Sequence, residues 1–207
     1  PVVTDERRAP DEDNPRGYFE IDRVKQLPTD AQWLWQEGGR AIKIIYRLLP
    51  WVPATLPCRI VFMERDLDEV IRSQQAMLRR QGAPELSEAG RQQLVRSYER
   101  ELAQVRARLA ATPAWKTLFV PHAALVAEPS DGPEAATMSL APPVAALVPA
   151  ERLLWCRAVA EHVGAPSSAV ARMEAVVDGR LYRNRRRAAV VAAGSAARPS
   201  AEVERAL

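Results

Sequence analysis

The chain has 207 residues, of which 47% are hydrophobic and 27% charged, enough for one ordinary globular domain and too few for two large ones. Its longest apolar runs, such as residues 60–63, fall far below the roughly 18 residues that a membrane-spanning helix needs, so we expect no membrane protein. The acid-rich stretch 5–13 is unlike a signal peptide, and the isolated Cys58 and Cys156 form neither a zinc motif nor a disulfide framework. These features favour a cytoplasmic protein without a bound metal.

The net charge of +3 conceals a basic cluster near the C-terminus. Without its five arginines the remaining chain carries −2, so we expect no nucleic-acid binding by the body of the protein. A local anion site within the cluster is compatible with the sequence, and nucleic-acid binding there would show a steep dependence on salt. The cluster consists of Arg180, Arg183, Arg185, Arg186 and Arg187.

The first quarter of the chain predicts a loop followed by short elements. Residues 1–17 are polar and end in a turn-forming Asn-Pro-Arg-Gly sequence. Apolar spacing predicts short helices over 18–27 and 31–36, the first ended by Pro28. The β-branched and nearly continuous apolar run at 41–46 predicts a strand buried on both faces.

The middle of the chain alternates between strand and helix signals. Residues 59–63 predict a second buried strand, and Asp66 and Ser87 open helices that run to about 81 and 111. A third strand is predicted at 117–120. Because parallel strands need crossover connections, this order predicts an α/β fold with a parallel sheet covered by helices.

The last third changes in composition. Residues 128–150 are rich in proline and small apolar residues without periodicity, which predicts an inserted loop. Two helices follow at 151–163 and 167–177. The Ala-rich residues 188–207 offer little to bury and are predicted to be a disordered tail.

One candidate anion site stands out at the start of the helix after the second strand. Arg65 lies at the carboxyl end of a buried strand, where open α/β sheets place ligands, and Ser73 falls two helical turns after the N-cap. A guanidinium and a hydroxyl could therefore converge on one anion. The alternative is that Arg65 pairs with Asp68 or Glu69 and that Ser73 faces solvent.

Residues 59–74 (RIVFMERDLDEVIRSQ) resemble the 3′-phosphate-binding segment of sulfotransferases, in which an arginine and a serine eight residues apart hold the 3′-phosphate of the nucleotide. Further similarities to bacterial sulfotransferase-family proteins follow in the family's order. They are DEDNPRGYFE at 11–20, GRAIK at 39–43, LLP at 48–50 and YRNR at 182–185. The resemblance covers most of residues 1–187 apart from the insertion at 128–150.

The resemblance implies a fold related to the P-loop kinases and a specific chemistry. The donor would be 3′-phosphoadenosine-5′-phosphosulfate, and an unknown small-molecule acceptor would receive the sulfuryl group by in-line transfer. Arg65 and Ser73 would bind the 3′-phosphate, and Arg183 and Arg185 would close over it. Lys43 matches the family's strand-end lysine and would contact the transferring group as a catalytic residue.

Two departures from the family pattern lead to further expectations. The phosphate loop of the Pro-Arg-Ser-Gly-Thr type has no counterpart here, and the usual histidine base aligns near Ile45, which cannot accept a proton. We therefore expect a domain that lacks its first strand and phosphate loop, as an inactive fragment or a degenerate relative. The open sheet edges would then favour self-association.

A different class of function stays open from the sequence. A non-catalytic interaction protein would use the helix at 87–111 and the Pro-rich insertion as binding surfaces. A sequence resembling the phosphate loop upstream of Pro1 would instead restore the enzyme interpretation.

Overall fold

The computed structural model describes residues 1–5, 7–12, 14–126 and 148–179. It is a mixed α/β structure, which confirms the predicted class at that level. Its strands and α-helices are β1 (Cys58–Glu64), α1 (Leu67–Arg80), α2 (Glu88–Ala111), β2 (Trp115–Pro121), α3 (His122–Val126), α4 (Val148–Val163) and α5 (Ser168–Val176). Three 3-10 helices precede them: η1 (Asp22–Gln26), η2 (Gln32–Gln36) and η3 (Tyr46–Trp51).

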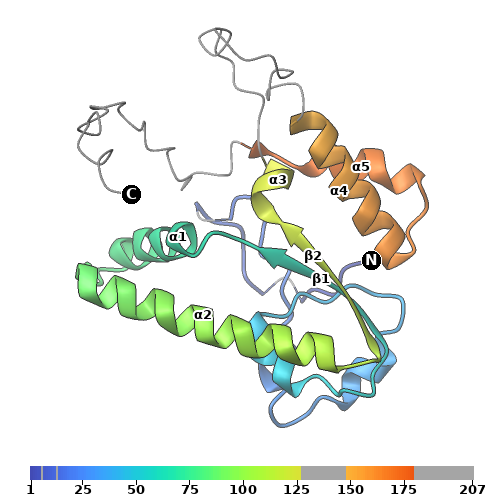
Figure 1. Ribbon diagram of the computed structural model, residues 1–207, viewed down its shortest axis with the longest axis horizontal. Coiled ribbons are helices and arrows are strands. Elements are labelled where there is room, and N and C mark those ends of the chain that lie inside the picture. Colours follow the sequence, from blue (N-terminus) through green and yellow to red (C-terminus); the bar gives the residue numbers. More distant parts are fainter. Residues whose placement is uncertain (6, 13, 127–147, 180–207) are drawn as a thin grey trace, which may run out of the picture.

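The sheet is a parallel pair. β1 and β2 align from Cys58 opposite Trp115 to Glu64 opposite Pro121, and the chain crosses between them through α1 and α2. This confirms the two predicted strands and their parallel order. Within the described residues, β1 and β2 form ladders only with each other, so each has one outer edge without a neighbouring strand. Figure 1 shows the pair at the centre of the molecule.

Both helices of the crossover begin at the predicted caps. The Asp66 carboxylate accepts a hydrogen bond from the Glu69 backbone N–H at 3.0 Å, and the Ser87 hydroxyl accepts one from Gly90 at 3.1 Å. Each bond satisfies a donor that the first helical turn leaves without an intrahelical partner. After α1, Gly82 adopts a φ of 83°, a conformation that glycine tolerates without steric cost.

The prediction of a buried strand at 41–46 is wrong. Only Ala41 forms a bridge, to Val2, and the chain then runs extended into η3. Alternate residues here are exposed, including Ile45, while Ile42 and Ile44 pack on the core. The segment covers an apolar surface with one side, and no described strand lies beside it to complete a ladder.

The two predicted N-terminal helices are shorter than expected and have 3-10 geometry. η1 covers only the second half of 18–27, and η2 covers 32–36. Single short turns of this kind are common as connectors, because the tighter 3-10 geometry is rarely sustained beyond a few residues. Their value to the fold is the apolar side chains that they bury.

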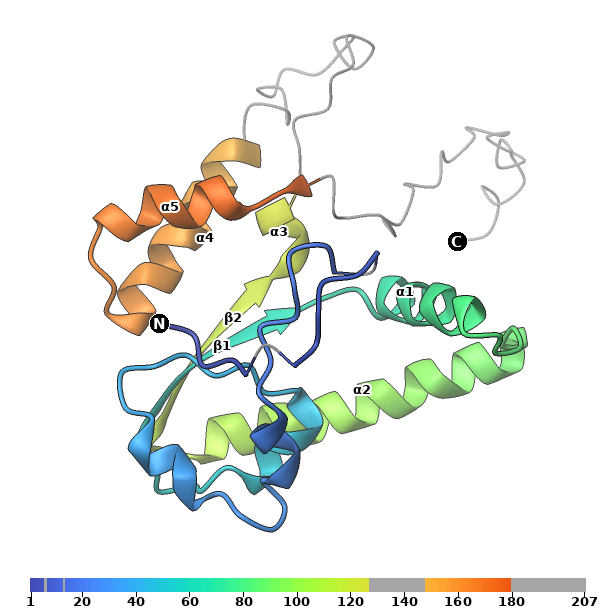
Figure 2. The same cartoon turned by 180° about the vertical axis from the view of Figure 1, so that it is seen from behind.

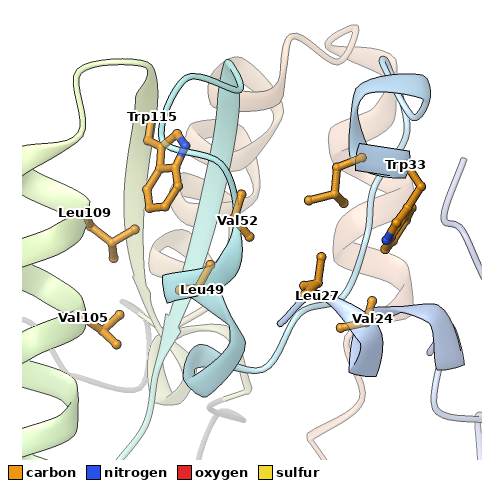
Figure 3. Packing of buried hydrophobic residues seen from close by; sticks show 9 residues of the cluster. Val24, Leu27, Trp33, Leu49, Val52, Val105, Leu109 and Trp115 are labelled. Atoms are coloured by element: carbon orange, nitrogen blue, oxygen red, sulfur yellow. The ribbon is translucent and has the colours of Figure 1, made fainter. Parts of the chain in front are cut away.

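One apolar cluster packs the 3-10 helices and their flanking residues against the crossover unit. Trp33 and Leu27 are each 2% exposed, and Leu109 of α2 is 4% exposed. Figure 3 shows the side chains of the 3-10 helices facing those of α2 and the start of β2. The buried members are Val24, Leu27, Trp33, Leu34, Leu49, Val52, Val105, Leu109 and Trp115.

The opposite side of the strands is covered by α4, against which α5 packs; Figures 1 and 2 show both helices across the sheet from α2. α4 contacts both strands, and Val120 of β2 is fully buried. Arg16 ties the N-terminal loop to the end of α5, since it donates to the Val176 carbonyl and to Asp178.

Several predicted segments lie outside the described residues. They are the Pro-rich insertion at 128–150 except for its last residues, which begin α4, and everything from residue 180, including the arginine cluster and the tail at 188–207. Among the helices that the structure describes, none combines the length and apolar character needed to cross a membrane.

Candidate functional site

A pocket of about 410 Å³ opens at the carboxyl ends of the two strands. Both arrowheads in Figure 1 point to this end of the sheet, from which α1 and α3 begin. The chain reverses into a helix directly after each strand, and α2 passes nearby, so side chains from five elements (β1, α1, α2, β2 and α3) meet here. The lining residues are Glu64, Arg65, Asp66, Glu69, Arg106, Pro121 and Ala123.

Arg65 and Glu69 form an ion pair on the wall of the pocket. Arg65 Nε lies 3.8 Å from Glu69 Oε2, and the two side chains are 30% and 5% exposed. Arg65 directly precedes the cap residue of α1 and Glu69 lies in the first turn of that helix, so the turn into α1 brings the two side chains together. The structure therefore contains the Arg65–Glu69 pair that the sequence offered as the alternative to an anion site, and it also places Arg65 in a pocket.

Arg106 reaches the same pocket from α2. Its guanidinium forms an ion pair with Glu64, the last residue of β1, and its carbon atom Cζ lies 5.1 Å from the centroid of the Phe119 ring. Phe119 itself packs against Phe62 of the neighbouring strand, with ring centroids 5.5 Å apart. The aromatic surface against which Arg106 lies thus involves both strands.

His122 is the first residue of α3 and lies between the lining residues Pro121 and Ala123. Burial lowers the pKa of His122 below its ordinary value, and the positive charge of Arg65 lowers it further, while Glu69 acts in the opposite direction. The imidazole is therefore neutral at pH 7. Its charge state is coupled to the two residues that form the buried side of the pocket.

The pocket contains both signs of charge. Its lining includes two arginines and three carboxylates, and each arginine has an acidic partner. Asp66 is engaged as the cap of α1. An anionic ligand entering this pocket would have to share each arginine with its carboxylate or displace that carboxylate. In a pocket lined by arginines alone, no carboxylate would compete with the ligand.

The sequence-predicted site residues are only partly brought together. Ser73 is half-buried on α1 and does not line the pocket. Lys43 lies in the extended segment after Ala41, where Nζ donates to the Tyr18 carbonyl and to Glu20, each at 3.0 Å. Arg183 and Arg185 lie outside the described residues.

Neither Arg106 nor His122 was predicted as a site residue from the sequence. Nothing in the spacing of residues 87–111 distinguishes Arg106 from the other arginines of that helix. For His122 a usable signal existed, because it directly follows a predicted strand, as Arg65 does.

Comparison of the chain with protein-family models, with curated proteins and with solved structures found no significant match.

Proposed function

We propose that this chain is a sulfotransferase-like domain and that its pocket receives the 3′-phosphate of 3′-phosphoadenosine-5′-phosphosulfate on Arg65. The observation that carries the proposal is the position of Arg65 on the wall of a pocket at the carboxyl ends of two parallel strands. Parallel α/β sheets bind ligands at this end. The family resemblance of residues 59–74 supplies the identity of the ligand.

Arg65 has the properties that phosphate binding requires. Its side chain is 30% exposed, so a ligand can reach it, and Glu69 fixes its orientation from the buried side. A guanidinium carries five N–H donors in a planar fork, more than one carboxylate partner uses. The phosphate would therefore bind beside Glu69, with Arg65 serving both anions.

The transfer itself would follow the chemistry of the family. An acceptor oxygen or nitrogen would attack the sulfur, the bond between sulfur and the phosphate oxygen would break, and adenosine 3′,5′-bisphosphate would leave with the bonding electrons. The acceptor would release its proton to water, since Ile45 stands where the family has its histidine base. We assign Lys43 to the transferring group, which requires its amine to exchange Glu20 for substrate. Ser73, Arg183 and Arg185 complete the proposed nucleotide site, with Ser73 turning toward the ligand.

The test is calorimetric titration with adenosine 3′,5′-bisphosphate. We expect weak binding that Arg65→Gln reduces about tenfold or more, because a hydrogen-bonded charge partner of the phosphate is lost. Glutamine keeps a donor for the buried Glu69, so the fold should persist. Arg72→Gln is the matched control: Arg72 is exposed on α1, which Arg65 precedes, and it does not line the pocket.

Three results would contradict the proposal. They are absence of binding, equal binding of adenosine 5′-monophosphate, and an equal loss in Arg72→Gln. The second would show that the 3′-phosphate is not recognised, and the third would show a general charge effect. A radiolabelled-donor assay with phenols, sugars and amines then measures whether the chain also transfers sulfuryl groups.

A second candidate is a non-catalytic interaction role for α2 and the Pro-rich insertion. In its favour, the buried residues of α2, Val105 and Leu109, lie near its C-terminal end, and Figures 1 and 2 show its first half extending with α1 away from the sheet.

Self-association through the outer sheet edges is a further proposal about partners. Size-exclusion chromatography over a range of protein concentrations tests it, and a concentration-independent monomer would exclude it.

A further inference from the structure

We infer that Arg106 is a second anion-binding residue of this pocket and that Glu64 occupies it as an internal competitor until a phosphate group replaces the carboxylate. The inference rests on the proposed function, in which the pocket receives a nucleotide phosphate. It adds Arg106 of α2 to the proposed phosphate-binding residues. It also explains how the charge of Arg106 is balanced before a ligand binds.

The position of Arg106 is set before any ligand arrives. The Phe119 ring lies against its guanidinium, with Cζ 5.1 Å from the ring centroid, and Glu64 holds it through an ion pair. Both contacts direct the guanidinium to the carboxyl end of β1, where Arg65 follows Glu64 in the chain. A preorganised cation binds an anion with less loss of side-chain entropy than a freely moving one.

The two ion pairs of the pocket differ in burial, and this decides which arginine can exchange its carboxylate partner for a ligand. The Arg106 and Glu64 side chains are 53% and 30% exposed, so Glu64 can turn to water when it loses its partner. Exposed ion pairs of this kind stabilise a fold very little. Glu69 is only 5% exposed, and removing Arg65 from it would leave a buried carboxylate without its cation. A ligand should therefore displace Glu64 and leave Glu69 in place.

The charges of the pocket select the class of ligand. With Glu69 retained and Glu64 displaced, the lining offers two arginines, Arg65 and Arg106, to one entering group. A dianionic phosphate can accept hydrogen bonds from both, whereas a carboxylate monoanion compensates less of the charge. The chemistry recognised is thus a phosphate group, either on a nucleotide or in a free form such as pyrophosphate.

The experiment titrates the wild-type chain and three variants with adenosine 3′,5′-bisphosphate and with pyrophosphate. Arg106→Gln should weaken binding about tenfold, because a charged hydrogen-bond donor is lost. Glu64→Gln should strengthen binding about threefold, since it removes the negative charge that competes with the ligand for Arg106. The gain is small because an exposed ion pair is weak. Arg100→Gln is the control: Arg100 is exposed on the same helix, carries the same charge and does not line the pocket.

The outcomes distinguish this inference from the proposed function. Pyrophosphate binding that depends on Arg106, with no binding of the nucleotide, would overturn the proposed function and support the inference. Nucleotide binding that needs Arg65 and not Arg106 would overturn the inference alone. Weaker binding in Glu64→Gln would show that Glu64 positions Arg106 without competing, which overturns the exchange mechanism. No binding of either ligand to the wild type or to Glu64→Gln would overturn both.

Discussion

The two ends of the sheet differ in what they bring together. Where the strands begin, Trp115 of β2 packs with Leu109 of α2 and with the side chains of the 3-10 helices (Figure 3). Where the strands end, the same helix contributes Arg106 to a pocket of charged side chains. On α2, Leu109 of the apolar contact and Arg106 of the pocket are only one helical turn apart.

This difference assigns stability and binding to separate ends. Burial of apolar surface at the first end removes side chains from water, and this contribution requires no ligand. The Arg106–Glu64 pair at the second end is half-exposed, so it adds little to stability and can rearrange at little cost. Substitutions in the apolar cluster should therefore change the free energy of unfolding, and those of the Arg106–Glu64 pair should change ligand affinity.

The largest expected effect on stability comes from Leu109→Ala. Leu109 is 4% exposed within the apolar cluster, and its truncation removes buried methyl groups and leaves a cavity. We expect the free energy of unfolding to fall by about 3 kcal/mol, measured by urea denaturation. Nucleotide affinity measured well below the midpoint should not change.

Leu154→Ala is the control for this substitution. Leu154 lies on α4 and is 62% exposed, so its truncation should change the free energy of unfolding by less than about 0.5 kcal/mol. An equal effect of the two substitutions would refute the assignment of stability to the apolar cluster. A loss of nucleotide binding in folded Leu109→Ala would refute the separation of the two ends.

The parts of the fold that could be predicted from the sequence are those that depend on local signals. Asp66 and Ser87 mark helix starts because the capping bonds join residues three apart. The segment at 41–46 has the composition of a buried strand, yet a ladder requires a neighbour that composition does not specify. The same segment runs extended, and its alternating exposure shows that one side covers the core.

The candidate site divides in the same way. Arg65 could be identified because its position directly after a strand has a meaning in any parallel sheet. Arg106 could not, because it meets Glu64 across 42 residues of sequence and only the packing of α2 brings the two together. Lys43 was chosen by similarity to a strand-end lysine, but no ladder forms around it and Glu20 binds its amine.

A smaller effect is expected where η3 meets α2. The Tyr46 hydroxyl donates to Glu101 at 2.7 Å, and burial together with this carboxylate raises the pKa of Tyr46 to about 12. Tyr46→Phe should lower the free energy of unfolding by about 1.5 kcal/mol, since the lost bond has a charged acceptor.

Tyr98→Phe provides the comparison. Its hydroxyl donates to the neutral amide oxygen of Gln74 at 2.9 Å, so the cost should be nearer to 1 kcal/mol. Urea denaturation of both variants measures the difference. A larger cost for Tyr98→Phe would mean that the charged acceptor does not strengthen the contact between η3 and α2.

The smallest predicted effect is a change of stability with pH at the charged end. Burial and Arg65 lower the pKa of His122 below its ordinary value of 6.5, against the influence of Glu69. As the pH falls through 6.5, the unfolded chain takes up a proton on this imidazole while the folded chain does not. The free energy of unfolding should therefore decrease from pH 7.5 to pH 5.5.

His122→Asn removes this contribution. As the pH is lowered, the free energy of unfolding of the wild type should therefore decrease more than that of the variant. Urea denaturation at several pH values measures that difference. Paired carboxylates such as Glu101, whose pKa Arg47 lowers, lose their contribution only as the pH falls below about 4.5, outside this range. The opposite slope would show that Glu69 stabilises a charged His122 more than burial and Arg65 oppose it. In that case the carboxylate, and not the guanidinium, would dominate the electrostatics of the buried side of the pocket, and an anion would find no favourable partner there.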